Sequence, residues 1–160
     1  MNTNNTLRSL RYTFDLSDSK MIEIFALGGQ TVTREQVSQW LKKDDHPDFK
    51  LLTDTQLSIF LNGFITKFRG KKDGLVPEPE KFITNNIIIK KIKIALSLQS
   101  DDMKDILNLA NMTISDHELS AFFRKPDHKN YRECKDQILR CFLKGLQLKH
   151  RPKDPIEHDW

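Results

Sequence analysis

The chain has 160 residues, of which 38% are apolar and 30% are charged, so it can bury a core of ordinary size. Its formal net charge of +4 and pI of about 9.0 are compatible with a nucleic-acid partner without requiring one. The sequence shows no apolar signal core and no apolar run of membrane-spanning length, so we expect a cytoplasmic protein without membrane contact. Two cysteines, Cys134 and Cys141, would lie roughly 10 Å apart on one helix, too far for a disulfide, which favours a reducing compartment.

An internal repeat dominates the sequence, because residues 4–69 and 86–151 align without a gap at a shift of 82 positions. Of the 66 aligned pairs, 17 are identical, and many others exchange similar side chains, as expected of a duplication. The segment between the copies is rich in Lys, Gly, Pro and Glu, as linkers are. We therefore expect a first helical repeat at 1–69, a linker at 70–85, a second repeat at 86–151 and a disordered tail at 152–160.

The first two helices of each copy are indicated by apolar residues three or four positions apart. The first helix of the two copies carries the matched residues Leu7, Leu10, Phe14 and Ile89, Ile92, Leu96. The second helix carries Met21, Ile24, Leu27 and Met103, Ile106, Leu109. In the first copy, Asp18 is the predicted N-cap of the second helix.

The third and fourth helices complete each unit. The third opens with a capping box, formed by Thr33 and Gln36 or by Ser115 and Glu118. The fourth carries a wide apolar face, formed by Leu57, Phe60, Leu61, Phe64, Ile65, Phe68 and by Ile138, Leu139, Phe142, Leu143, Leu146. Gly63 and Gly145 lie inside these helices, which predicts a close helix crossing. The expected fold is all-α: two tandem four-helix repeats with helix-turn-helix-like units, packed together with pseudo-twofold symmetry.

The second and third helices of each copy resemble a helix-turn-helix, in which the second helix of the motif enters the DNA major groove. Their turn is one or two residues longer than the tight form. Polar residues expected to face outward are Arg34, Ser38, Gln39, Lys42, Lys43 and Ser120, Arg124, Lys125. Glu35 and Asp116 near the helix starts would repel phosphate. The alternative interpretation is an ordinary capped helix of a bundle.

Basic residues are concentrated in the second copy. Residues 1–69 carry nine Lys or Arg against eight Asp or Glu, whereas residues 119–151 carry nine against three. After Lys129, we expect a basic stripe on the fourth helix, formed by Arg132, Lys135, Arg140 and Lys144. Such a stripe could bind the phosphates of nucleic acid or an acidic protein. A solvated face is the alternative interpretation.

The residues that could carry chemistry are two Asp-His pairs after the third helices, Asp45-His46 and Asp127-His128. A carboxylate beside an imidazole can orient a tautomer or bind a metal. No further cluster with ligand spacing accompanies them, and no phosphate loop, nucleophile elbow or paired carboxylate is found. We therefore expect no enzyme, metal or other cofactor. The alternative is a polar loop in which Asp caps the next helix and Pro47 or Pro126 stops the preceding one.

A resemblance to the YehS-like family of small bacterial proteins is carried by LRSLRYTFDLSDSKMIEIFALGG, REQVSQWLKKDD, IFLNGFI and HELSAFFRKPDHKNYRECKDQILRCFLKGLQLKHRP. It covers residues 4–152. The resemblance implies a duplicated unit and a bacterial cytoplasm. It supplies no activity and no catalytic residues, since the family is a domain of unknown function.

These observations favour a non-enzymatic binding protein that contacts nucleic acid through the third helices and the basic face of the second copy. The rival is a protein–protein interaction module or a dimeric scaffold, whose partner is an acidic protein or a second copy of the chain. The two differ in one respect. Half-site reading of DNA requires both third helices to present their polar faces on one side, about 34 Å apart.

Overall fold

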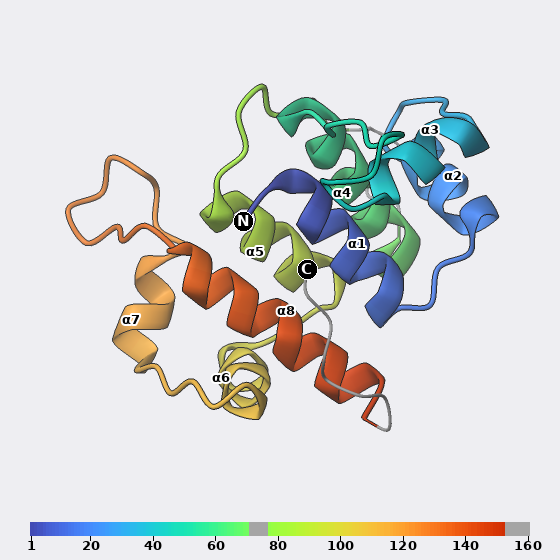
Figure 1. Ribbon diagram of the computed structural model, residues 1–160. Helices are drawn as coiled ribbons and strands as arrows, with labels where there is room; N and C mark the ends of the chain where they lie inside the picture. The colour runs from blue at the N-terminus through green and yellow to red at the C-terminus, as the bar shows by residue number, and fades with distance from the viewer. Residues whose placement is uncertain (71–76, 153–160) are drawn as a thin grey trace.

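The computed structural model describes residues 1–70 and 77–152, and in these ranges every regular element is a helix. The first half contains α1 (Thr3–Thr13), α2 (Asp18–Leu27), α3 (Arg34–Leu41) and α4 (Asp54–Arg69). The second half repeats the order with α5 (Asn85–Ala95), α6 (Ser100–Leu109), α7 (Asp116–Ala121) and α8 (Asp136–His150). Figure 1 shows the eight helices, and the all-α prediction with four helices in each copy is confirmed.

Helix starts follow the local sequence closely. Capping boxes open α3 at Thr33 and α7 at Ser115, as predicted. The N-cap of α2 is Ser17, whose hydroxyl accepts from the backbone N–H of Lys20, and Asp18 is the first helical residue. The predicted cap was therefore wrong by one position. An acidic side chain at the first helical position still interacts favourably with the helix dipole.

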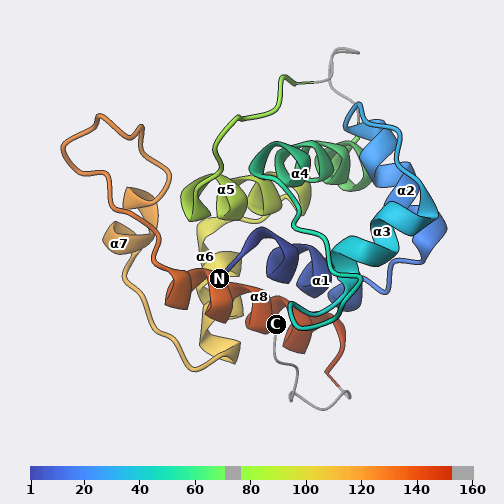
Figure 2. The same ribbon diagram turned by 45° about the horizontal axis from the view of Figure 1, so that its top comes forward.

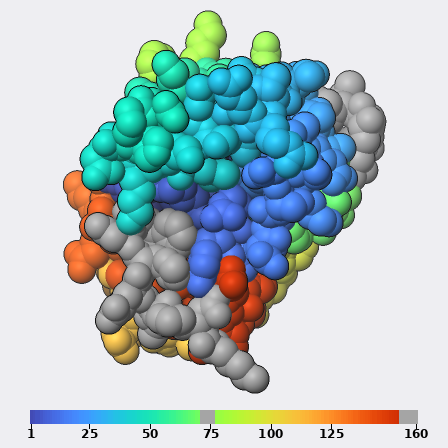
Figure 3. Space-filling model, turned by 45° about the vertical axis from the view of Figure 1, so that its right-hand side comes forward, coloured from blue at the N-terminus to red at the C-terminus, as the bar shows by residue number. Residues whose placement is uncertain are grey.

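The two repeats interlock through their first and fourth helices. The fourth helix of the first repeat, α4, packs along α5, and α1 packs along α8 (Figures 1 and 2). In the space-filling view, the end of α8 lies against the end of α1 (Figure 3). The shift of 82 positions converts one pairing into the other, which confirms the pseudo-twofold relation.

Two matched aspartates extend this symmetry to single atoms. Asp54, at the start of α4, accepts a hydrogen bond from the backbone N–H of Ile83 at 3.0 Å. Asp136, at the start of α8, accepts one from the amino group of Met1 at 2.7 Å. Met1 and Ile83 are themselves 82 positions apart. Each contact ties the segment before a first helix to the start of the other repeat's fourth helix.

Within each repeat, the second and fourth helices cross at a glycine. A Cβ added to Gly63 would lie 1.8 Å from the carbonyl oxygen of Ile24 on α2. A Cβ added to Gly145 would lie 2.0 Å from the carbonyl oxygen of Ile106 on α6. The predicted close crossing is present in both copies, because no side chain larger than hydrogen fits between these backbones.

The predicted core residues are mostly buried, with two departures. Leu109 is 48% exposed, and its neighbour Leu107 is buried in its place. Phe68, near the end of α4, is 41% exposed. Both residues lie in the last turn of their helices.

Part of the predicted linker is built into the fold. Residues 71–76 lie outside the described part of the chain, as do residues 153–160 of the predicted tail. The backbone N–H of Glu80 donates to the Ser58 hydroxyl, and that hydroxyl donates to the Glu80 carboxylate, both at 3.0 Å. The segment from residue 77 to α5 is therefore fastened to α4.

Candidate nucleic-acid interface

The loop after each third helix is positioned by one buried asparagine on the first helix of the same repeat. The amide of Asn4 donates to the carbonyls of Trp40 and Lys50 and accepts from the N–H of Leu52, at 2.9–3.0 Å. Asn86 makes the matched contacts in the second repeat, at 2.8–3.0 Å. This role was not predicted. Its signal was an asparagine identical in both copies, in the first turn of the first helix.

The Asp-His pairs belong to a tight turn of that loop. The Nδ1 atom of His46 accepts from the backbone N–H of Asp48, and that of His128 accepts from the N–H of Asn130, both at 3.0 Å. Both imidazoles therefore have a structural use, although the sequence interpretation was inexact. The N-cap positions of the following helices are held by Thr53, which forms a capping box, and by Lys135, which makes no side-chain cap, and not by the Asp of either pair. The preceding helices end at Leu41 and Ala121, well before Pro47 and Pro126.

The two loops differ in what holds them to the body. In the first repeat, the Arg8 guanidinium donates to the Lys42 carbonyl at 2.7 Å and lies 3.7 Å from the Asp44 carboxylate. In the second repeat, the matched residues are Lys90 and Pro126, so this ion pair has no counterpart. The second loop, residues 124–133, stands away from the body in both ribbon views (Figures 1 and 2).

This projecting loop and the adjoining helix α8 hold most of the predicted basic residues. Four of them lie on the loop itself and are exposed: Arg124, Lys125, Lys129 and Arg132. Lys135 immediately precedes α8, and Arg140 and Lys144 lie exposed on that helix. Placing Arg132 and Lys135 on the fourth helix was wrong, because α8 begins at Asp136. We call these seven residues the basic surface.

Few acidic side chains neutralise the basic surface. Within residues 1–70 and 77–152, no ion pair involves Arg124, Lys125 or Lys129, whereas Lys135 lies 3.4 Å from the carboxylate of Glu133. Arg140 lies near Asp136, and contributes to the lowered pKa of that carboxyl after the Met1 amino group and the Asn85 amide. The loop therefore carries uncompensated positive charge into solvent.

The predicted residues of the first copy form a separate group on α3. Arg34 donates to Asp18 at 3.3 Å and to Ser19 at 3.4 Å. Three further residues that were predicted to face outward are half-buried: Ser38 and Gln39 on α3, and Lys42 at its C-cap. Lys43 is exposed. Both ribbon views place α3 and the projecting loop at opposite ends of the molecule, so the structure does not bring the two groups together (Figures 1 and 2).

Helix α7 is a poor match to a DNA-recognition helix. It has only six residues, and its first turn contains Asp116 and Glu118. The Asp116 carboxylate forms an ion pair with the Lys104 ammonium at 2.6 Å. The hydrogen bond within this pair raises the pKa of the Lys104 ammonium. Ser120 donates to the carbonyl of His117 in its own helix. Carboxylates at the start of a helix repel the phosphates that such a helix must approach.

The two cysteines are free thiols in different environments. Cys134 lies before α8 and is buried, whereas Cys141 lies within α8 and is half-buried. Burial raises the pKa of the Cys134 thiol to about 12, with smaller contributions from the charges of Asp136 and Glu133. Across the described ranges, no group of three or more His, Cys, Asp or Glu side chains is placed to hold a metal ion.

Comparison with known proteins agrees with the duplicated architecture. A family described as "Protein of unknown function (DUF1456)" matches residues 3–70 and again residues 85–151, and the chain belongs to this family. It is 44% identical over 154 residues to the "Uncharacterized protein YehS" of Escherichia coli strain K12, a match that covers 96% of this chain and 99% of that protein. No solved structure matches the chain. Among the described residues, none of the helices is both long enough and apolar enough to cross a bilayer.

Proposed function

We propose that the chain is a non-enzymatic protein that binds nucleic acid through the phosphate backbone, using the basic surface. The observation that carries the proposal is the loop of residues 124–133, which projects four exposed Lys or Arg side chains against two acidic residues, whereas the matched loop of residues 42–51 has three Lys against three Asp. Flexible cations on a projecting loop suit phosphate contacts, which add affinity and salt dependence without reading sequence.

Backbone contact fits this surface better than base reading does. A recognition helix needs exposed polar residues near its start and enough length to lie in the major groove. The six residues of α7 span roughly 9 Å, and its first turn is acidic. The eight residues of α3 begin with Arg34, whose side chain pairs with Asp18. We therefore place the contacts on the second repeat, next to α7 rather than along it.

A salt-dependent titration tests the proposal. Binding of a labelled duplex and a labelled single strand is followed by fluorescence anisotropy between about 50 and 200 mM salt. Four phosphate contacts predict a slope of about −3.6 in a plot of log K against log salt for duplex DNA. A response that does not vary with salt would rule out the proposal.

The repeat supplies a matched control for the same experiment. Lys125 and Lys43 occupy identical positions in the two loops. The substitution Lys125→Gln should reduce the steepness of the salt slope by about 0.9 on a duplex, whereas Lys43→Gln should leave it unchanged. Equal effects of the two substitutions would mean that binding follows overall charge and not the projecting loop.

A protein-interaction module is the second candidate, and exposed apolar side chains favour it. Leu51 is 64% exposed and Phe82 is 81% exposed. Leu51 and Ile83, the neighbour of Phe82, line a cleft of about 440 Å³. Light scattering at micromolar concentration distinguishes this function, because a dimeric scaffold should become monomeric on the substitution Phe82→Ser. Lys125→Gln should leave such a dimer intact.

A further inference from the structure

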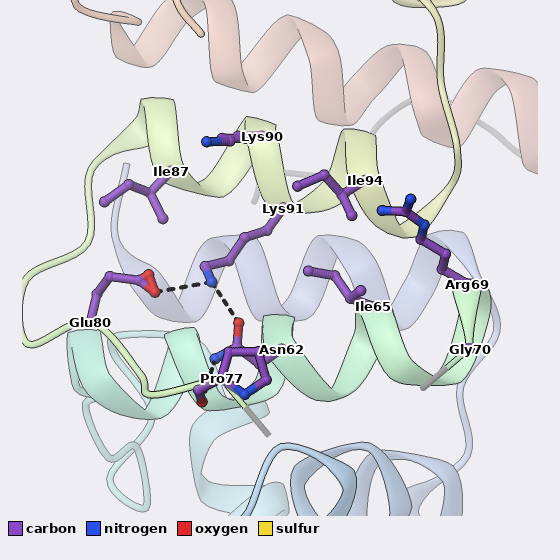
Figure 4. A pocket seen from close by; sticks show the side chains of 10 residues that line it. All are labelled: Asn62, Ile65, Arg69, Gly70, Pro77, Glu80, Ile87, Lys90, Lys91 and Ile94. Atoms are coloured by element: carbon purple, nitrogen blue, oxygen red, sulfur yellow. Dashed lines mark hydrogen bonds and ion pairs between the residues drawn. The ribbon is translucent and has the colours of Figure 1, made fainter. Parts of the chain in front are cut away.

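A cavity of about 660 Å³ lies between α4, α5 and the segment before α5 (Figure 4). Its apolar walls come from Ile65 on α4 and from Ile87 and Ile94 on α5. A second set of lining residues is cationic, with Arg69 at the end of α4 and Lys90 on α5. This size and this mixture of apolar walls with a few charged groups are typical of small-molecule sites.

One end of the cavity is fixed by an ion pair. The Nζ atom of Lys91 lies 3.0 Å from the Glu80 carboxylate and donates to the amide oxygen of Asn62 at 2.5 Å (Figure 4). Asn62 is only 2% exposed, and the side chains of Lys91 and Glu80 are half-buried. Because Lys91 already has two partners, it holds the wall in place. Among the described residues that line the cavity, the positive charges available to a ligand are those of Arg69 and Lys90.

The pseudo-twofold axis provides an internal comparison for the cavity. The α1–α8 pairing is equivalent to the α4–α5 pairing, and there Tyr12 and Arg151 take the places of Ile94 and Arg69. The Arg151 guanidinium lies 4.0 Å from the centre of the Tyr12 ring and donates to the Tyr12 carbonyl at 2.8 Å. The protein therefore packs an arginine on an aromatic ring at one pairing and leaves an aliphatic wall beside the arginine at the other.

Lys90 also differs from its counterpart, Arg8. Arg8 is 7% exposed, and its partners include the side chains of Asn5 and Asp44. The residues matched to those two partners are Ile87 and Pro126, neither of which can accept a side-chain hydrogen bond. As a result, Lys90 is exposed at the cavity, and its charge is directed to solvent instead of to a protein carboxylate.

From these observations we propose that the cavity binds a small organic anion with an apolar body, such as a carboxylic acid of medium chain length. The apolar body would lie against Ile65, Ile87 and Ile94, and its anionic group would pair with Arg69, which lies beside Ile94 (Figure 4). Lys90, whose side chain points away from Arg69 along α5, would add positive charge at the rim of the cavity (Figure 4). This site is separate from the basic surface, because none of the seven residues of that surface lines the cavity.

Two fluorescent probes with similar aromatic bodies test the charge requirement. 1-Anilinonaphthalene-8-sulfonate carries a sulfonate, and N-phenyl-1-naphthylamine carries no charge. The anionic probe should bind at one site and be displaced by octanoate, and the neutral probe should bind at least about tenfold more weakly. The double substitution Arg69→Gln, Lys90→Gln should remove this difference. In contrast, Lys144→Gln, on the basic surface, should change neither affinity.

The repeat also suggests the substitution that fills the cavity. Ile94→Tyr introduces the residue found at the matched position of α1, and Arg69 can then pack on it as Arg151 packs on Tyr12. This variant should lose at least about tenfold in affinity for the anionic probe, while Ile94→Val should keep its affinity. Thermal unfolding confirms that both variants are folded. Unchanged probe binding by a folded Ile94→Tyr variant, or failure of octanoate to displace the probe, would overturn the assignment.

Discussion

Removal of the buried Asn4 amide should destabilise the first repeat. The amide satisfies three backbone groups of the segment after α3, at Trp40, Lys50 and Leu52. The substitution Asn4→Ala leaves those groups without partners in a region that water enters poorly. We expect the free energy of unfolding to fall by about 3 kcal/mol, measured by urea denaturation.

A matched control separates this effect from a general cost of losing an asparagine. Asn108 is exposed on α6, and Asn108→Ala should change the free energy of unfolding by less than about 0.5 kcal/mol. Amide hydrogen exchange gives a local readout, because protection of the Leu52 N–H should be lost in the Asn4→Ala variant. If the Leu52 N–H stays protected in that variant, the asparagine does not hold the loop.

The Cys134 thiol should be almost unreactive in the folded protein. Burial raises its pKa to about 12 from an ordinary value of 9.0, so very little reactive thiolate forms near pH 8. The folded chain keeps the proton longer than the unfolded chain does. The stability that the protonated Cys134 thiol contributes is therefore fully present below pH 9, and it is lost as the pH rises through about 12.

Thiol titration with a disulfide reagent checks this expectation. With the substitution Cys141→Ser, the remaining thiol should react at least about a hundredfold faster in denaturant than in buffer at pH 8. Comparable rates in the two conditions would show that Cys134 is accessible. The residue matched to Cys134 in the first repeat is Leu52, and a cysteine at an apolar position is more often packed than reactive.

The two helix crossings at Gly63 and Gly145 leave no room for a side chain larger than hydrogen. In an open helix, replacing glycine by alanine stabilises by about 1 kcal/mol. At these positions a Cβ would lie within 1.8 to 2.0 Å of a carbonyl oxygen, so α2 and α4, or α6 and α8, would have to separate. We expect Gly63→Ala and Gly145→Ala each to lower the free energy of unfolding by about 3 kcal/mol.

The control for this prediction is an exposed position on one of the same helices. Ala26 lies exposed on α2, and Ala26→Gly should cost about 1 kcal/mol from helix propensity alone. Gly63→Ala and Ala26→Gly should therefore both lower the free energy of unfolding, the first through a clash between helices and the second through helix propensity. A stabilising effect of Gly63→Ala would mean that the crossing can widen without loss of packing.

The same crossings show what could be predicted for an element and what could not. A glycine repeated at one place in two long helices signalled the close approach correctly. The start of α8 was missed because the spacing of Arg132 and Lys135 also suits a helix. The Asn86 amide donates to the Arg132 carbonyl and accepts from the Cys134 N–H. A helix through Arg132 would need that carbonyl for its own backbone hydrogen bonds. A long-range contact thus overrides the local pattern.

At the scale of the whole molecule, the sequence predicted the duplication and pseudo-twofold symmetry but not the interlocking. The face of Leu7 and Leu10 was visible because it is apolar. The first helix is also buried on a second side, where it carries polar residues such as Ser9 and Thr13, both at most 3% exposed. Such a stripe resembles a solvated face in the sequence. The cavity beside α5 depends on the same packing between the repeats, so it could not be predicted either.

This interlocking predicts that the two repeats unfold as one unit. Because α1 packs on α8 and α5 packs on α4, neither repeat keeps its own core when the other unfolds. Trp40 reports on the first repeat, being 5% exposed and 5.2 Å from the ring of Phe25. With the substitution Trp160→Phe, it is the sole tryptophan of the chain.

A destabilising substitution in the second repeat, combined with Trp40 fluorescence from the first, tests whether the two repeats unfold together. Gly145→Ala weakens the α6–α8 crossing of the second repeat, yet the thermal midpoint from Trp40 fluorescence should fall by about 5 °C or more. Helical circular dichroism should give the same midpoint within error, as a two-state transition requires. Gly63→Ala, close to the reporter, serves as the positive control. In the Gly145→Ala variant, the thermal midpoint from Trp40 fluorescence could instead stay unchanged while about half of the helical circular dichroism is lost at a lower temperature. That result would mean that each repeat folds on its own.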